Sequence, residues 1–158
     1  MRVLILGNSG SGKSTLARSL AAAHGLAHLD LDTIVWVPGE IAVPRPVADV
    51  HADLQRFAGD HAVWVIEGCY GELVEVALPW CSELVFLNPG EAACLANNAR
   101  RPWEPHKYAD PADQARMLPF LREWVSQYYE REDSCSYRCH RRVFDSFAGS
   151  KREITTAS

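Results

Sequence analysis

The sequence predicts an α/β fold in which a parallel sheet is covered by helices on both faces. Short apolar runs, typical of buried strands, alternate with segments of helical periodicity. The 158 residues are enough for one domain with a substantial core, and 47% of them are hydrophobic against 23% charged. No stretch of about 18 apolar residues is present, so we expect no membrane-spanning helix. We therefore expect a single domain over residues 1–158.

Strands and helices alternate through the first half of the chain. The apolar run at 3–6 ends at a glycine and predicts a strand buried on both faces. Residues 14–24 carry leucines and alanines at helical spacing and end at Gly25. A second strand is expected over 26–32, and a helix from Val47 to about residue 59 follows a proline-rich loop.

The same alternation continues in the second half. Apolar runs at 63–66 and 84–87 predict the third and fourth strands. A short helix is expected over 71–77, and another helix ends near Arg100.

The last third of the chain carries a capping signal and one weak strand. Asp110 followed by Pro111 predicts a helix start, because aspartate caps helices and proline suits their first position. Pro119 is expected to kink that helix or to shift its start. A fifth, weaker strand is expected over 143–147.

Composition points to a protein of the cytoplasm. The run from Met1 to Gly7 is too short for a signal peptide. Five cysteines leave one unpaired in any disulfide arrangement, which favours reduced thiols. The formal net charge of −4 provides no basic field for a polyanion, so a nucleic-acid partner is disfavoured.

Charge is unevenly distributed along the chain. Residues 19–99 contain 2 basic residues, Arg45 and Arg56, against 11 acidic ones, whereas residues 100–152 contain 11 basic and 8 acidic ones. One interpretation is a solvated acidic face beside a mixed C-terminal half. The other is an acidic acceptor site that faces an arginine-bearing flap.

The strongest signal is a glycine-rich segment between the first strand and the first helix. Residues 7–14 match G-x-x-x-x-G-K-[ST], the Walker A motif typical of P-loop NTPases. Its glycines let backbone N–H groups surround a phosphate, and the helix that follows adds the positive end of its dipole. Lys13 is expected to reach the β- and γ-phosphates, and the Ser14 hydroxyl to bind Mg²⁺. The candidate nucleotide-binding residues here are Asn8, Ser9, Gly10, Ser11, Gly12, Lys13, Ser14 and Thr15.

Carboxylates stand where the second and third strands end. Asp30 and Asp32 share a face at strand spacing, and Glu67 ends the next strand. The carboxyl ends of parallel strands form the ligand crevice of such sheets. We assign Asp30 to the metal and Asp32 to the acceptor hydroxyl, with Glu67 as the second candidate for either task. The alternative for these residues is turn and capping chemistry.

Three segments together resemble the adenylate-kinase-like small P-loop kinases. They are the glycine-rich segment, His28–Ile34 (HLDLDTI) and Trp64–Tyr70 (WVIEGCY). The nearest pattern is that of the so-called DNA topology modulation proteins, and shikimate and gluconate kinases are more distant. The resemblance covers residues 1–105 well and the remainder loosely.

This resemblance implies a five-stranded parallel sheet in the order 2-3-1-4-5, with MgATP as phosphoryl donor. It implies an acceptor-binding region at about 33–62 and a lid at about 100–115. The glycine triplet that binds shikimate in shikimate kinases is replaced by Glu67-Gly68-Cys69. The acceptor-binding arginines of nucleoside monophosphate kinases have no clear counterpart beyond Arg45 and Arg56. The candidate acceptor-binding residues are Asp32, Arg45, Glu67, Gly68 and Tyr70.

Two basic pairs complete the site implied by the resemblance. Arg100 and Arg101 occupy the position of lid arginines in related kinases, where a guanidinium offsets charge on the transferred phosphoryl. The alternative is that they complement a helix dipole. Lys151 and Arg152 resemble the late loop that packs against adenine, and a frayed basic tail accounts for them equally well.

Another pattern, Cys135-x-x-x-Cys139-His140, is one ligand short of a metal clip and indicates free or structural thiols.

The sequence therefore predicts a kinase, a P-loop transferase that moves the γ-phosphoryl of ATP to a small hydroxyl-bearing molecule with Mg²⁺. Lys13, Asp32, Arg100 and Arg101 are the catalytic candidates, and Ser14 and Asp30 are the metal ligands. The low basic content of residues 19–99 favours a neutral or cationic acceptor. The alternative function is a nucleotide-binding regulatory module that hydrolyses slowly. We expect a monomer or homodimer.

Overall fold

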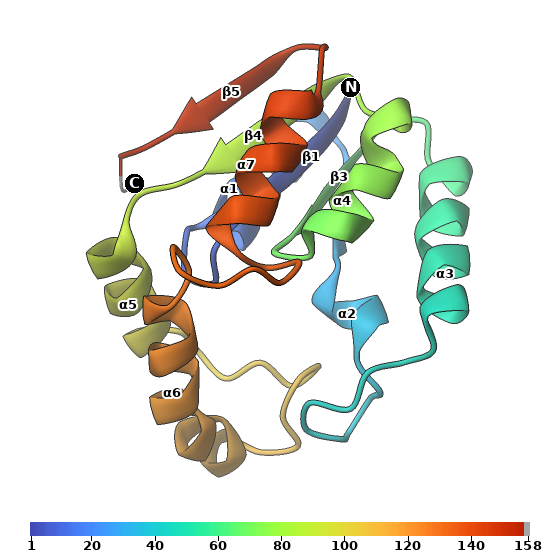
Figure 1. The fold of residues 1–158 in the computed structure, drawn as a ribbon. Helices are drawn as coiled ribbons and strands as arrows, with labels where there is room; N and C mark the ends of the chain where they lie inside the picture. Colours follow the sequence, from blue (N-terminus) through green and yellow to red (C-terminus); the bar gives the residue numbers. More distant parts are fainter. Residues whose placement is uncertain (157–158) are drawn as a thin grey trace.

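A five-stranded parallel sheet forms the centre of the computed structural model, which describes residues 1–156 (Figure 1). The strand order is β2-β3-β1-β4-β5, and this confirms the predicted order and the α/β class. The strands are β1 (Arg2–Gly7), β2 (Ala27–Asp30), β3 (Trp64–Gly68), β4 (Glu83–Leu87) and β5 (Lys151–Ile154).

Helices cover both faces of this sheet. The helices are α1 (Lys13–His24), α2 (Asp32–Val35), α3 (Val47–Asp60), α4 (Gly71–Ala77), α5 (Glu91–Ala99), α6 (Pro111–Ser126) and α7 (Tyr137–Ser146), with a 3-10 turn η1 (Leu78–Trp80), and four of them pack on the sheet. Helix α1 packs on one face, and α3, α4 and α7 pack on the other, with α4 and α7 in front in Figure 1. The fold thus has three layers.

The period of two in β1 explains why each face has its own core. Val3 and Ile5 are buried with the apolar side of α1, whereas Leu4 and Leu6 are buried against α3, α4 and α7. A strand buried on both faces is a continuous apolar run, and this is the pattern by which β1 was predicted.

The prediction of a strand over residues 143–147 is wrong. Val143 and Phe144 belong to α7 and are buried together with Cys139 and His140. These four residues are three to four positions apart, the spacing of one face of a helix. The hydroxyl of Ser136 caps the start of this helix by accepting from the Cys139 N–H. The fifth strand lies further on at Lys151–Ile154, and there it pairs with β4.

The capping signal at Asp110 is confirmed. Its side chain accepts from the Asp113 N–H at 2.9 Å, and Pro111 takes the first position of α6. The helix continues past Pro119 to Ser126. Among residues 1–156, no helix combines the length and apolarity that crossing a membrane requires.

Candidate active site

The glycine-rich loop between β1 and α1 is held in place by helix α5. The Asn97 side chain donates to the Gly10 carbonyl at 2.8 Å, and the buried Asn98 donates to the carbonyl of Ser9 at 3.2 Å. The backbone at Gly10 and Gly12 has positive φ, at 81° and 100°. A Cβ on Gly10 would lie 2.3 Å from the Cys94 carbonyl oxygen, so glycine is required there on both grounds.

The first residues of α1 face the end of β3. The Lys13 ammonium donates to the Asn8 carbonyl at 2.8 Å. The Ser14 hydroxyl donates to Glu67 Oε1 at 2.8 Å, and His28 Nε2 lies 3.3 Å from the same oxygen. Glu67 is 1% exposed, so Ser14 and His28 hold an almost fully buried carboxylate. This contact places Glu67 beside the expected metal ligand Ser14.

Asp30 and Asp32 lie together at the end of β2, although the strand stops at Asp30 and α2 begins at Asp32. The Asp32 N–H donates to Asp30 Oδ1 at 2.9 Å. Burial, together with the charges of Glu67 and Asp32, raises the pKa of Asp30 to about 7. An excess of carboxylates around Asp30 is the electrostatic setting that a bound cation would relieve.

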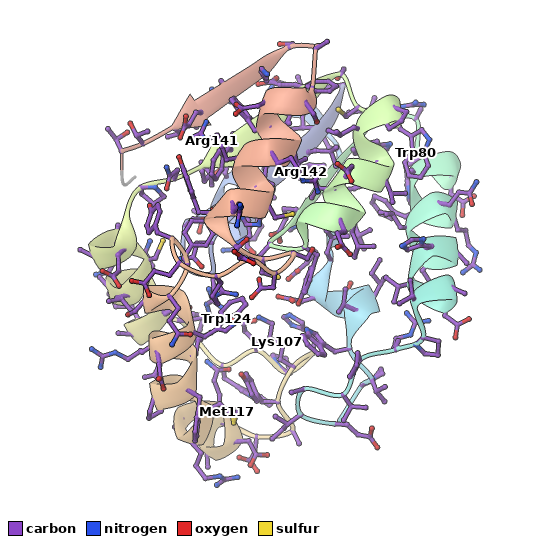
Figure 2. All side chains as sticks on the ribbon, viewed as in Figure 1. Trp80, Lys107, Met117, Trp124, Arg141 and Arg142 are labelled. Atoms are coloured by element: carbon purple, nitrogen blue, oxygen red, sulfur yellow. The ribbon has the colours of Figure 1, made fainter. Side chains whose placement is uncertain are left out.

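Lys107, from the segment between α5 and α6, forms the central ion pair of the site. Its ammonium lies 2.8 Å from Asp32 Oδ2 and 3.2 Å from Glu104 Oε2, and Figure 2 shows it between α6 and α2. The Tyr70 hydroxyl donates to Asp32 Oδ1, and Trp36 Nε1 lies 3.3 Å from that oxygen. Both carboxylate oxygens of Asp32 are therefore engaged.

The charges around Asp32 fix its protonation. Burial alone would raise its pKa, but the Lys107 charge and the hydrogen bonds from Lys107 and Tyr70 lower the pKa to about 2. Asp30 and Asp32 thus differ in charge state: Asp30 is easily protonated, whereas Asp32 stays ionised.

One cavity of about 740 Å³ connects these groups. Its wall includes the glycine-rich loop, both aspartates and the segment from Arg100 to Tyr108. The predicted site residues that line it are Ser9, Gly10, Gly12, Lys13, Ser14, Thr15, Asp30, Asp32, Glu67, Gly68, Tyr70, Arg100 and Arg101. Aromatic and aliphatic side chains form the rest of the wall, among them Trp36, Ile41, Tyr108, Met117, Phe120, Leu121 and Trp124.

Other predicted site residues do not line this cavity. Asn8 and Ser11 belong to the glycine-rich loop but are buried, 3% and 7% exposed, and do not line the cavity. The Arg45 guanidinium donates to the Ile34 carbonyl at 2.8 Å and to Asp53 at 2.7 Å. Of the acceptor region at 33–62, the cavity includes Trp36 and residues 40–42, whereas α3 is excluded.

Lys151 and Arg152 lie in strand β5 rather than in a loop. They form the first half of the strand, opposite Leu84 and Val85 of β4, whereas the glycine-rich loop follows the carboxyl end of β1. Lys151 Nζ donates to the Phe144 carbonyl at 2.8 Å, and Arg152 pairs with Glu83 at 3.0 Å.

Sequence reasoning missed three polar residues of the lid segment. Besides Lys107, these are Glu104, which pairs with Arg101 at 3.1 Å, and His106, whose Nε2 lies 3.5 Å from Asp30. His106, Asp30 and Asp32 offer three ligand atoms within 4.8 Å of one another. No spacing pattern marks these residues, because a loop carries no periodicity.

With this geometry in place, three solved structures offer a comparison. Shikimate kinase from Bacteroides thetaiotaomicron aligns over 99% of this chain and 86% of its own, with a TM-score of 0.59 and 16% identity. The chain has the shikimate-kinase fold. A sugar kinase from Janibacter sp. HTCC2649 covers 97% of this chain and 83% of its own, with a TM-score of 0.51 and 15% identity.

The YorR protein of Bacillus subtilis, solved in complex with phosphorylated GDP, is a third. It covers 98% of this chain and 85% of its own, with a TM-score of 0.52 and 10% identity. No family model and no curated protein matches the sequence. These comparisons establish a P-loop NTPase fold.

Proposed function

We propose that the chain is an ATP-dependent phosphotransferase that moves the γ-phosphoryl group of MgATP to a hydroxyl group of a small molecule. The observation that carries this proposal is the shared cavity. It joins the Walker A residues to an ionised carboxylate, Asp32. Donor and acceptor groups can then meet in one cavity.

The donor end of the cavity fits a nucleoside triphosphate. Gly10 and Gly12 present backbone without side chains, and Lys13 lies at the start of α1. Arg100 and Arg101 line the same cavity from the other side, where they can offset charge on the transferred phosphoryl group. ATP in preference to GTP is inferred from the resemblance to adenylate-kinase-like proteins.

The donor set beside Ser14 fits Mg²⁺, because it consists of hard oxygen atoms. Ser14 and Asp30 would hold the ion, and Glu67, already bonded to the Ser14 hydroxyl, would join them directly or orient a bound water. When bound, Mg²⁺ offsets negative charge on the phosphate oxygens. The raised pKa of Asp30 supports this assignment, since a neighbouring cation would favour its ionised form.

The acceptor end is centred on Asp32. Since this carboxylate is ionised and held by Tyr70, it can accept a hydrogen bond from an acceptor hydroxyl and direct that oxygen toward the phosphoryl group. We propose a neutral or cationic acceptor. Two of the cations that line the cavity already have carboxylate partners, Lys107 with Asp32 and Arg101 with Glu104.

The test is ADP release from MgATP, measured with and without a panel of neutral, cationic and anionic hydroxyl compounds. We expect one neutral or cationic compound to raise turnover at least about 100-fold over water. Lys13→Met should abolish this turnover, because the charge beside the phosphates is lost. Lys151→Met is the matched control and should leave it unchanged, since Lys151 lies outside the cavity.

A flat panel with slow basal hydrolysis would contradict the phosphotransferase proposal. It would instead favour a nucleotide-binding regulatory module. One observation supports that second candidate: Lys107, Tyr70 and Trp36 already satisfy both oxygens of Asp32 without an acceptor. If an anionic compound proved the best acceptor by kcat/KM, the proposed neutral or cationic acceptor class would be wrong, but the phosphotransferase proposal would stand.

We also propose that the chain is related to the DNA topology modulation proteins, on the basis of the sequence segments that resemble theirs. We further propose that the protein is a monomer or homodimer and that it lies in the cytoplasm. The net charge of −4 supports a small-molecule acceptor over a nucleic acid, because nonspecific DNA affinity comes largely from cationic contacts to phosphates.

A further inference from the structure

Two cysteines that are 66 positions apart in sequence have their thiols in contact beside the cavity. Cys69 Sγ lies 3.3 Å from Cys135 Sγ. Cys69 follows β3 and lines the cavity, whereas Cys135 precedes α7. Among residues 1–156, no other two cysteine sulfurs are in hydrogen-bond contact.

The backbone on either side holds these two segments together. The Gly71 N–H donates to the Ser134 carbonyl at 2.9 Å, and His140 Nε2 donates to the Cys69 carbonyl at 2.6 Å. A disulfide needs its sulfurs about 2.0 Å apart. The sulfurs of Cys69 and Cys135 therefore have to approach each other by about 1 Å. Rotation of the two cysteine side chains can supply this movement.

The two thiols differ in their access to solvent. Cys69 is partly exposed at the cavity wall, whereas Cys135 is 8% exposed behind it. A small oxidant that enters the cavity meets Cys69 first, and the product on Cys69 then faces Cys135.

We propose that this pair is an oxidation site, at which a small hydroperoxide oxidises Cys69 and Cys135 then closes a disulfide with it. In the first step the O–O bond breaks, the Cys69 sulfur takes one oxygen as a sulfenic acid, and water or an alcohol leaves. In the second step the Cys135 sulfur attacks the Cys69 sulfur, the S–O bond breaks, and water leaves with the thiol proton. The two cysteines together lose two electrons and two protons.

The experiment treats the full chain with hydrogen peroxide, alkylates the remaining thiols, and maps peptides without reduction. We expect a Cys69–Cys135 link, a mass loss of about 2 Da before alkylation, and three alkylated cysteines out of five. The link closes a 66-residue loop, so Tm should rise by on the order of 10 °C and return after dithiothreitol.

Serine variants test the assignment. Cys69→Ser and Cys135→Ser should each lose both the link and the rise in Tm, whereas Cys81→Ser, the control, should keep them. Alkylation of all five thiols, oxidation of Cys69 without a link, or a link to Cys139 would overturn the proposal. The peptide map of the wild-type chain decides the matter even if a variant does not fold. These readouts are independent of the proposed phosphotransferase activity.

Discussion

At the scale of single residues, the contacts of Asp32 suit it to orient a hydroxyl group and not to remove its proton. Tyr70 and Trp36 reach one of its oxygens and Lys107 reaches the other. A carboxylate with a pKa near 2 is a weak base, so Asp32 orients a hydroxyl group better than it removes a proton before transfer. An acceptor hydroxyl must also displace Lys107 or bind beside it.

The ion pair between Lys107 and Asp32 should be measurable in stability. In a double-mutant cycle of Lys107→Met and Asp32→Asn, we expect a coupling free energy of about 1–3 kcal/mol, because the pair is mostly buried. Denaturant unfolding of the wild type, both single variants and the double variant measures it. The exposed pair Arg138–Glu132 is the control, and its cycle should give less than about 0.5 kcal/mol. Equal couplings would contradict this account of Asp32.

The phosphate-binding residues and the carboxylates could be predicted from sequence because they follow strands, and strand ends lie at a known edge of a parallel sheet. Lys107 could not be predicted, since its contact with Asp32 spans 75 positions and depends on the path of an irregular segment. Arg45 was predicted at the acceptor because it is one of few cations in its region. The structure instead pairs it with Asp53.

At the scale of elements, the glycine-rich loop and α5 act as one unit. Asn97 and Asn98 bond to the loop backbone, so the loop shape depends on a helix nearly ninety positions away. Sequence reasoning identified the loop but not this support, because two asparagines at a helix end carry no motif.

Gly10 of this loop and Gly39, between α2 and α3, have nearly the same φ, so a comparison of the two separates backbone strain from steric crowding. Gly10 and Gly39 have φ of 81° and 80°, but a Cβ on Gly39 meets no atom within 4 Å. Gly39→Ala should lower the unfolding free energy by about 1–2 kcal/mol through strain alone. Gly10→Ala should cost about 1–3 kcal/mol more, because its Cβ meets the Cys94 carbonyl. Chemical denaturation of both variants gives the difference, and equal losses would mean that the α5 contact is not rigid.

The misplaced fifth strand has a physical reason. Strand β5, with the sequence Lys-Arg-Glu-Ile, is an edge strand that is mostly exposed, so it lacks the apolar run by which buried strands are recognised. Helix α7 carries three arginines, Arg138, Arg141 and Arg142, and its short apolar stretch at Val143 and Phe144 resembles that of a strand.

At the scale of the whole molecule, the buried His140 couples stability to pH. Its Nε2 donates to the Cys69 carbonyl, and in the neutral ring Nδ1 accepts from the Tyr128 hydroxyl at 2.7 Å. Burial lowers the pKa of His140 to about 4, from 6.5 in an unfolded chain. Between these values the unfolded state binds more protons, and stability falls as the pH falls.

We expect the unfolding free energy of the wild type to fall by about 3 kcal/mol more than that of His140→Gln between pH 6.5 and 4. Denaturant titrations at several pH values measure both proteins. The comparison with the variant is needed because Asp30, whose pKa is raised, changes stability in the opposite direction over part of this range. Parallel curves for the two proteins would contradict a neutral, buried His140.

The order of the sheet has a consequence for how the chain is made. Strand β1 is buried between β3 and β4, and β2 pairs with β3, so neither of the first two strands has a partner when it leaves the ribosome. Pairing of β1 waits for Trp64, which is opposite Arg2 in the finished sheet. At about 5–20 residues per second, this delay lasts roughly 3–12 s, during which an apolar strand with two open edges is exposed to aggregation. Translation of β3 is thus the event that allows the sheet to begin.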